Sequence, residues 1–443
     1  MRVFVLLVLA FLTFGSTAFS DWIIENVDIP GINPSLALNS TGYPCIAYPV
    51  EGIGVKYAEW DGSQWLIDCA YSLTYPNIAY VSLALDVADI PHISFGLSSL
   101  FYVTRDSSSE WQTEQVEFGG NVKHISIALD GINSPHIAYN KSFGASIGYA
   151  TRSDSIWSIE YLDNGNNTGW FASLRLDTDD NPHISYSRRS PDLLMYASMD
   201  MTSGWSFQVI DSLADECNNT SLALSEEGVP HISYNAGNEV RYTYWTGSGW
   251  HIETLDACDS GSFGWGTSIA LDSDDQPHIA YCLADEDYLM YASWDGSDWQ
   301  YELIDTLPSY ILRRGDPDIV LDTLDRPHIA YWAGYPDHDL RYAWNDGTGI
   351  SEGFEEADCN LLCGYPHPNP TLGMTTLQFI LTTDSHVIVT IYDVSGHTVQ
   401  IPESGQFPAG THDMSFSVTT PGIYMMRIVS EDQSFVRRFI VLD

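Results

Sequence analysis

A five-residue unit recurs along this chain, and nearly every copy carries a histidine. The copies read PHISF, PHIAY or PHISY, and a seventh, PCIAY at Pro44–Tyr48, has Cys45 in place of the histidine. The histidines are His92, His136, His183, His231, His278 and His328. Imidazole transfers protons and binds metals near neutral pH. A structural role in packing would also explain why a histidine recurs at the same position of nearly every copy.

Aspartates recur between the first two strands of several repeats. Examples are Asp177 and Asp179 in DTDDN, and Asp272 and Asp274 in DSDDQ. Alternating carboxylates at this density are typical ligands of Ca²⁺. The pattern lacks the glycine and the distal glutamate of an EF-hand loop, and aspartate also favours turns by hydrogen-bonding its own backbone. We interpret these residues as turn-forming and keep Ca²⁺ as a weaker alternative. No other cofactor is indicated.

The composition excludes some classes of partner. The 443 residues include 17 Lys and Arg against 59 Asp and Glu, which gives a formal charge of −42. Nucleic acid binding needs clustered Lys and Arg, so nucleic acid is excluded as a partner, and anionic membranes are disfavoured. The 14 Trp, 26 Tyr and 17 Phe indicate a packed protein rather than a disordered acidic one.

The chain begins with features of an export signal. Arg2 is followed by an apolar run from Val3 to Phe14 and then by small residues, so we expect residues 1–20 to be a signal peptide. No segment is predicted to span a membrane. Seven cysteines allow disulfides in an exported protein. A bridge between Cys359 and Cys363, or within the group Cys217, Cys258 and Cys282, is open at this stage.

The pentapeptide belongs to a longer period. Each copy is preceded at a constant offset by a segment such as SLAL, and is followed by Tyr with a small residue, then by a turn and a Trp. Successive first prolines lie between 44 and 50 residues apart. A period of this length with four short strands per unit is typical of a β-propeller blade. We therefore predict an all-β, seven-bladed β-propeller over residues 21–350.

The seventh unit lacks its fourth strand, and the start of the mature chain supplies one. Trp22–Asp28 matches Trp250–Asp256 in the spacing of Trp, Glu and Asp. The early strand is therefore predicted to close the ring, which leaves no open edge between the first and last blades.

A second β domain is predicted at the C-terminus. Residues 351–368 are acidic and then Pro-rich, which favours a linker. Residues 369–443 alternate as strands over about 75 residues, which is typical of a small β-sandwich. Expected strands are Thr376–Leu381, Val387–Tyr392, Asp413–Val418, Ile423–Ile428 and Phe435–Val441.

This C-terminal region resembles the type A sorting domain of type IX secretion. The resemblance rests on YPHPNPTLG, VIVTIYDVSGHTV, GIYMMRIV and the final FVRRFIVLD, and it covers roughly 366–443. His367-Pro368 interrupts the usual YPNP run, and Arg437-Arg438 stand where lysines are usual. The resemblance implies recognition by secretion machinery at the outer membrane of a Gram-negative bacterium, and a secreted or surface-attached product. The propeller itself resembles secreted bacterial seven-bladed propellers only as a class.

The repeated histidines fit a structural role. Strand alternation places each histidine on a face that a neighbouring blade buries, and a buried imidazole needs a hydrogen-bond partner. The serine of the first strand is a nearby candidate acceptor. WD-repeat propellers resemble this arrangement, with a polar network repeated in every blade.

Function is expected in the loops of one face, where variation leaves the blade intact. The loops entering the first strand and those joining the second and third strands share that face. Aromatic residues beside arginines there resemble a carbohydrate-binding rim. The candidate ligand-binding residues are Trp170, Phe171, Arg188, Arg189, Trp265, Tyr310, Arg313, Arg314 and Tyr335.

Three classes of function remain open. The first is an exported binding or adhesion protein, with a glycan or a surface protein as ligand. The second is a secreted glycoside hydrolase or polysaccharide lyase that uses carboxylates such as Asp285, Glu286 or Asp287 with Asp337 or Asp339. The third is a structural surface protein. The sequence contains no persuasive catalytic motif, and we name no catalytic residue.

Overall fold

The computed structural model describes residues 22–345 and 361–441, except 74–77, 79, 142–145, 154, 164, 166, 201, 213–216, 259–264, 284–287, 308–316, 335–338, 364–373, 382, 394–396, 421 and 431–432. The chain divides into two compact units, one of them Trp22–Asn345 and the other including Asp346–Asp443. The predicted signal peptide lies outside the described residues. Strands are the only regular elements among the described residues.

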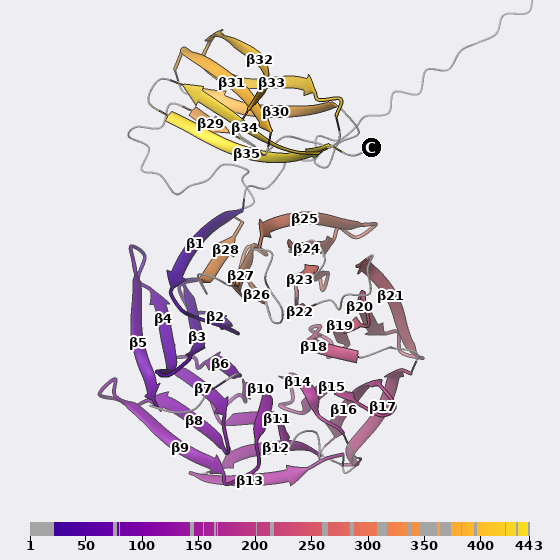
Figure 1. Ribbon diagram of the computed structural model, residues 1–443. Coiled ribbons are helices and arrows are strands. Elements are labelled where there is room, and N and C mark those ends of the chain that lie inside the picture. Colours follow the sequence, from indigo (N-terminus) through magenta and orange to yellow (C-terminus); the bar gives the residue numbers. More distant parts are fainter. Residues whose placement is uncertain are drawn as a thin grey trace, which may run out of the picture. The chain divides into compact units, whose positions relative to one another are not determined.

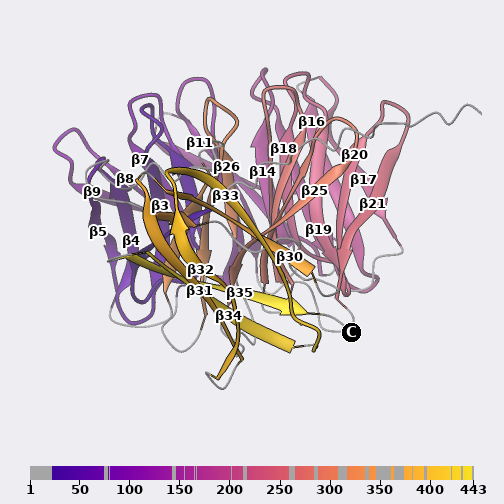
Figure 2. The same cartoon turned by 90° about the horizontal axis from the view of Figure 1, so that it is seen from above.

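The first unit consists of seven four-stranded antiparallel sheets set around a central axis (Figure 1). Figure 2 shows the same blades after a 90° turn. Blades one to three are β2 (Ser35–Leu38), β3 (Pro44–Val50), β4 (Gly54–Trp60), β5 (Trp65–Ser72); β6 (Val81–Leu85), β7 (Pro91–Gly96), β8 (Leu100–Arg105), β9 (Trp111–Glu117); and β10 (Val122–Leu129), β11 (Pro135–Lys141), β12 (Ser146–Ser153), β13 (Ile156–Tyr161).

Blades four to seven repeat this plan from the inside outward. They are β14 (Trp170–Leu176), β15 (Pro182–Arg188), β16 (Leu193–Asp200), β17 (Gly204–Asp211); β18 (Cys217–Leu224), β19 (Pro230–Ala236), β20 (Glu239–Trp245), β21 (Trp250–Ala257); β22 (Trp265–Leu271), β23 (Pro277–Leu283), β24 (Tyr288–Trp294), β25 (Trp299–Thr306); and β26 (Asp318–Leu321), β27 (Pro327–Trp332), β28 (Leu340–Trp344), β1 (Ile23–Asp28). The predicted seven-bladed propeller is confirmed.

The ring is closed by the N-terminal strand. β1 pairs antiparallel with β28, with Ile23 opposite Trp344 and Glu25 opposite Tyr342. The last blade is therefore built from both ends of the propeller sequence, as the Trp22–Asp28 pattern predicts. Closure of this kind removes the exposed strand edge that would otherwise pair with another chain.

Aromatic contacts join each blade to the next. The strand-four Trp of one blade packs edge-on against the strand-three Tyr of the blade before it, as Trp111 does on Tyr57 with ring centroids 5.6 Å apart. The other pairs are Trp157 on Tyr102, Trp205 on Tyr149, Trp250 on Tyr196, Trp299 on Tyr242, Trp22 on Tyr291 and Trp65 on Tyr342. The Trp and Tyr of the repeat are thus core residues, because each seals an interface between blades.

Hydroxyls of the strand-two tyrosines form a second set of links. Tyr234 donates to Asp211, at the end of β17 in the preceding blade, at 2.8 Å, and Arg241 contacts the same carboxylate at 2.7 Å. Tyr331 and Arg341 do the same with Asp305. Many of the scarce basic residues are therefore used to neutralise carboxylates between blades.

The cysteines of the propeller are thiols. Cys217, Cys258 and Cys282 are buried and belong to different hydrophobic clusters. The bridge considered within this group is therefore wrong, because the three thiols pack as small apolar side chains in separate blade interfaces. The side chains of Cys359 and Cys363 lie outside the described residues.

The C-terminal unit is a two-sheet β-sandwich. One sheet is β29 (Leu361–Cys363), β30 (Met374–Leu381) and β33 (Gly410–Ser417), and the other is β32 (Thr398–Phe407), β31 (Ser385–Asp393), β34 (Gly422–Ser430) and β35 (Gln433–Val441). Its core includes Phe379, Val389 and Met426. The sequence did not predict β32, because Pro402 and Gly405 interrupt its strand pattern. The strand β29 was also not predicted, because it lies within the segment expected to be a linker.

Candidate functional site

The inner strands of the seven blades are joined by a ring of hydrogen bonds around the central channel. The serine that begins the inner SLAL segment accepts the backbone N–H of the next blade's inner strand, as Ser35 does from Leu83 at 3.0 Å. The same bond joins Ser82 to Ile127, Ser126 to Leu174, Ser173 to Leu222, Ser221 to Ile269 and Ser268 to Ile319. Asp318 completes the ring by accepting from Leu36 at 2.8 Å.

This ring corrects one sequence-based expectation. The strand-one serine is used between blades and is not the histidine's partner. Instead, the imidazole Nδ1 of each PHIxY or PHISF histidine contacts a strand-three Tyr hydroxyl, as His231 does with Tyr242 at 2.6 Å. The Nε2 of five of these histidines faces an aspartate of the turn after strand one: His92 faces Asp86, His136 Asp130, His183 Asp177, His278 Asp272 and His328 Asp322. These contacts support a structural role for the histidines.

The aspartates of the repeat serve the same turns. Asp177 accepts the backbone N–H of Asp179 at 2.9 Å and of Asn181 at 2.8 Å, and Asp272 makes the equivalent bonds. Asp179 and Asp274 are exposed. In the described part of the chain, no group of three or more His, Cys, Asp or Glu is placed to hold a metal ion. Binding of Ca²⁺ at Asp177, Asp179, Asp272 and Asp274 stays an untested prediction.

Two residues interrupt the pattern of the inner strands, and both line the channel. Six blades begin the inner SLAL segment with Ser, whereas blade seven begins it with Asp318. Two positions later, five blades have Ala and blade seven has Val320, whereas blade four has Arg175. A repeat that needed only stability would use one residue at each position, so these departures mark the channel as a candidate site.

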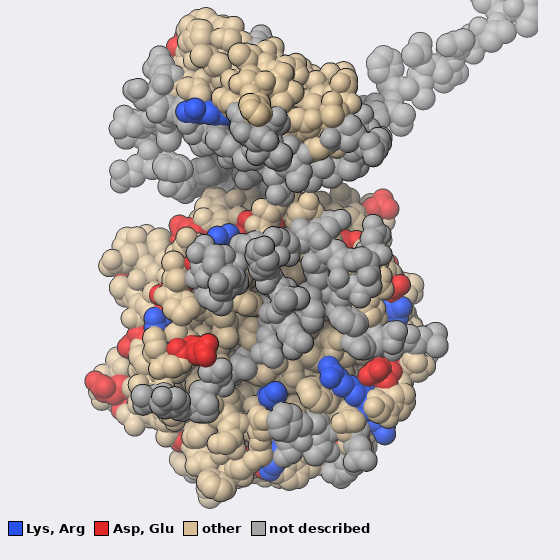
Figure 3. Space-filling view, in the orientation of Figure 1, with Lys and Arg blue, Asp and Glu red and all other residues tan. Residues whose placement is uncertain are grey.

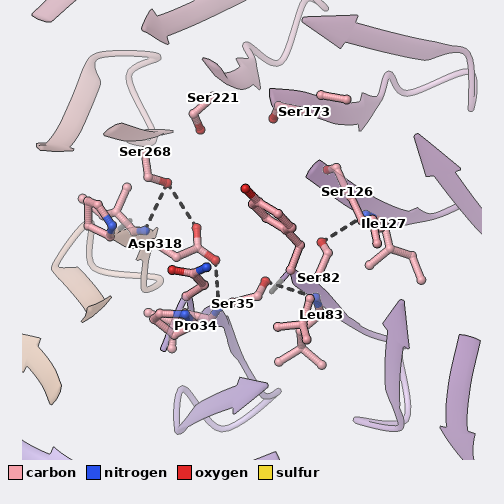
Figure 4. Close-up of a pocket in the computed structure, with 18 of the residues that line it drawn as sticks. Pro34, Ser35, Ser82, Leu83, Ser126, Ile127, Ser173, Ser221, Ser268 and Asp318 are labelled. Atoms are coloured by element: carbon pink, nitrogen blue, oxygen red, sulfur yellow. Dashed lines mark hydrogen bonds between the residues drawn. The ribbon is translucent and has the colours of Figure 1, made fainter. Parts of the chain in front are cut away.

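The channel contains a cavity of about 350 Å³. Figure 4 shows the serine ring and Asp318 around it, with Ser268 hydrogen-bonded to the carboxylate of Asp318 at 3.1 Å. Arg175, Asn33 and Tyr80 also line the cavity. The lining is therefore rich in hydroxyl groups and holds one carboxylate and one guanidinium.

The two channel charges influence each other through space. Burial raises the pKa of Asp318, and the Leu36 N–H and then Arg175 oppose that rise. Burial lowers the pKa of Arg175, and Asp318 opposes that fall. The Arg175 guanidinium also donates a hydrogen bond to the carbonyl of Leu174 at 2.8 Å. Both groups thus face a common, poorly solvated space.

We call the end of the channel at which the inner strands begin its mouth. Residues there have an unusual backbone conformation, and one of them, Asn33, lines the cavity. Two residues before the serine, Asn33, His124, Phe171 and Asn219 have φ between 42° and 54°. In blades three to five this follows a β-bulge in the inner strand. Blade six has Gly266 at this position, with φ 71°. Bulky residues in the left-handed region are disfavoured by about 1 to 3 kcal/mol, so their side chains are candidates for a functional role.

Aromatic side chains form a continuous row across this mouth. Tyr80 of blade two contacts His124 of blade three with ring centroids 4.4 Å apart, and His124 contacts Phe171 of blade four at 4.1 Å. The guanidinium of Arg189 lies 4.4 Å from the ring centre of Trp170. Arg189 also donates to Asn218 of blade five at 2.8 Å. The row therefore links blades two to five.

The structure brings together part of the predicted rim. Trp170, Phe171 and Arg189 are neighbours, although Trp170 comes from the inner strand and Arg189 from the loop after β15. The guanidinium of Arg188 lies beside Gly165, in the loop that precedes Trp170. The strand β22 begins at Trp265, but its side chain lies outside the described residues, as do Tyr310, Arg313, Arg314 and Tyr335.

Sequence reasoning did not single out Tyr80, His124, Asn218, Arg175 or Asp318 as site residues. A usable signal was present for Arg175 and Asp318, because both depart from the blade consensus at positions facing the axis. His124 and Tyr80 occupy a position that varies from blade to blade and has no chemical motif. Only the contacts between blades in the folded ring show that these side chains meet.

The propeller arginines that the structure describes divide into two groups. Arg105, Arg152, Arg241, Arg326 and Arg341 are ion-paired. Arg175, Arg188 and Arg189, all in blade four, form no ion pair with a carboxylate among the described residues. On the face shown in Figure 3, the Lys and Arg side chains nearest the middle lie over blades three to five. A guanidinium group without a carboxylate partner can donate hydrogen bonds to the oxygen atoms of a ligand.

The carboxylate pairs considered for hydrolysis have little structural support. Asp285, Glu286, Asp287 and Asp337 lie outside the described residues. Asp339 is buried and forms an ion pair with Arg341 at 3.3 Å. The hydrolase or lyase hypothesis stays a prediction.

Comparison with solved structures finds distant similarities to propeller proteins. One is a mutant of AofleA from Arthrobotrys oligospora, with 11% identity, coverage of 64% of this chain and 90% of that one, and a TM-score of 0.45. Another is the SapL1 lectin in complex with alpha methyl fucoside, with 12% identity, 64% and 98% coverage, and a TM-score of 0.46. A third is the polysaccharide lyase Uly1, with 10% identity, 72% and 90% coverage, and a TM-score of 0.48. These similarities are too distant to indicate a shared ligand or activity.

The C-terminal unit has a clear family match. Residues 366–442 match the model of the secretion system C-terminal sorting domain, in agreement with the type IX resemblance of the sequence. No curated protein matches the chain. In the described residues, no helix is long and apolar enough to cross a membrane. The C-terminal unit is therefore a secretion system C-terminal sorting domain, and the protein is exported to the surface of a Gram-negative bacterium or beyond it.

Proposed function

We propose that the propeller is an exported binding module for a glycan, which it holds at the channel mouth over blades two to five. The observation that carries the proposal is the row formed by Tyr80, His124, Phe171 and Trp170, with Arg189 and Asn218 at its end. The partly exposed rings of Tyr80, Phe171 and Trp170 can stack on sugar rings, with the buried His124 packed between Tyr80 and Phe171. Guanidinium and amide groups bond sugar hydroxyls.

Two unpartnered donors near this row favour a ligand rich in acceptors. The indole Nε1 of Trp170 and the Nε of Arg188 are buried and have no hydrogen-bond partner among the described residues. Buried donors normally find a partner in the protein or in an ordered molecule. Hydroxyl and carboxylate oxygens of a glycan are acceptors of the required kind.

The test is a glycan array probed with the full mature chain and with variants of the mouth. Trp170→Ala and Arg189→Ala are expected to weaken binding about ten-fold, the loss of one or two polar or stacking contacts. His124→Gly is a useful third variant, because glycine occupies the corresponding position in blade six without strain.

The matched control is Phe207→Ala. Phe207 lies in the outer strand β17, is 43% exposed, and is outside the mouth. Its removal is expected to leave glycan binding unchanged. Absence of glycan binding by the wild type, or equal binding by all four variants in folded form, would contradict the proposal. In that case hydrolysis of a polysaccharide panel or a purely structural role would be the remaining explanations.

A further inference from the structure

The central channel contains polar groups that the blade fold does not require. Five other blades have Ala at the position equivalent to Arg175, and the six other blades have Ser at the position equivalent to Asp318. Ser accepts the interblade N–H as well as Asp318 does, so the carboxylate is not needed for the ring. Both groups are half-buried in the channel, and replacing charges withdrawn from water by neutral residues is often neutral or stabilising. The retention of both charges in one cavity therefore calls for a ligand.

The composition of the cavity restricts the ligand class. The serine hydroxyls and Asp318 offer hydrogen bonds of the kind that a polyol makes, and Arg175 offers the planar donor pair that binds a carboxylate. The volume of about 350 Å³ lies at the small end of ligand sites, which run from about 300 to 1,000 Å³. One sugar unit fits this space better than an oligosaccharide.

The position of the cavity connects it with the mouth. Its lining includes Asn33 and Tyr80 as well as Arg175, and Tyr80 is also the first residue of the aromatic row. A glycan lying on the row can therefore place one unit in the channel.

We infer that the channel binds an acidic sugar unit, with its carboxylate on Arg175 and its hydroxyls on Asp318 and the serine ring. This inference rests on the proposed function and names the charge of the ligand. The unit is either a free sugar acid or the acidic residue of a longer glycan, and both present the same chemistry.

The experiment measures binding of free glucuronate to the full mature chain by calorimetry. Glucose is the neutral analogue and acetate is the carboxylate alone. Glucuronate is expected to bind and both controls to bind at least ten-fold more weakly. A glucuronate-terminated disaccharide in a parallel arm shows whether the natural form is free or part of a chain.

Two variants restore the blade consensus and locate the site. Arg175→Ala and Asp318→Ser are each expected to weaken glucuronate binding about ten-fold or more. Arg152→Ala is the matched control and is expected to bind normally, because Arg152 lies in the third strand of its blade, β12, where it pairs with Glu114. If Arg175→Ala fails to fold, Arg175→Lys is used, which keeps the charge but loses the planar donor pair.

Each other outcome overturns the inference. If glucose bound as tightly as glucuronate, Arg175 would not be recognising a carboxylate. If acetate bound as tightly as glucuronate, the site would not be recognising the sugar hydroxyls. Glucuronate binding that survives both Arg175→Ala and Asp318→Ser would place the site elsewhere. A neutral glycan that binds the array and depends on Trp170 would refute the channel inference while leaving the proposed function intact.

Discussion

Trp22 packs edge-on against Tyr291, with ring centroids 5.1 Å apart and an interplanar angle of 71°. Its Nε1 also donates to Glu302 at 2.9 Å. Trp65 makes the same kind of contact with Tyr342 of the last blade at 5.5 Å. The first strand thus reproduces, between blades six and seven, the contact that the continuous chain makes between other blades.

The closing contact predicts an effect on stability. Trp22→Ala is expected to lower the free energy of unfolding by about 2 to 4 kcal/mol, because a large half-buried ring and its hydrogen bond are lost. Urea titration followed by tryptophan fluorescence measures this. Ile29→Ala is the control, since Ile29 is 59% exposed. A mature chain that starts after Asp28 and stays monomeric with an unchanged midpoint would contradict closure by β1.

The serine ring predicts a second effect. Ser221→Ala removes the acceptor of the Ile269 N–H, which lies at 3.2 Å, and leaves a buried donor without a partner. The expected loss is about 1 to 3 kcal/mol of unfolding free energy. Ser248→Ala, in an exposed turn, is the matched control. Equal stability of the two variants, measured by thermal unfolding, would show that the ring bond is dispensable.

His231 predicts how stability depends on pH. Burial lowers the pKa of His231 to about 4, against about 6.5 in an unfolded chain. The folded state therefore resists protonation more than the unfolded state does. The contribution to stability is full above about pH 6.5 and is lost as the pH falls toward 4. Thermal unfolding between pH 7 and pH 4 is expected to show this decline.

A single substitution tests whether His231 is responsible. Blade five has Ser225 where five other blades have the aspartate that faces the histidine. Ser225→Asp is expected to raise the pKa of His231 and so to reduce the loss of stability on acidification. A rise of about 1 in that pKa corresponds to about 1.4 kcal/mol. Ser248→Asp adds the same charge on an exposed turn and controls for net charge. Identical pH profiles of the two variants would rule out this role of His231.

The sorting domain predicts where a truncated chain accumulates. Removal of residues 366–442 is expected to retain the propeller inside the cell envelope, because the recognition element for secretion is lost. The unit Trp22–Asn345 has its own core in every blade and is expected to stay folded. Cell fractionation with an antibody to the propeller checks this. Equal export of both forms would show that the signal lies elsewhere.

The sequence predicts the histidine role less completely than the fold. A repeated His in a buried strand implies a hydrogen-bond partner. The strand-one Ser, the turn Asp and the strand-three Tyr of the repeat are all close enough in sequence to be that partner. The structure selects the strand-three Tyr and the turn Asp, and assigns the strand-one Ser to the next blade. Partner choice depends on side-chain direction across strands, which a linear pattern does not contain.

Blade number and strand order follow from the sequence alone, because the strands of blades one to six each pair within one repeat. Closure by Trp22–Asp28 follows as well, because this segment matches the strand that the seventh repeat lacks. The candidate site does not follow in the same way. Arg175 and Asp318 meet in one channel, and Tyr80, His124 and Phe171 form one row, only because a closed ring brings equivalent positions of different blades around a single axis.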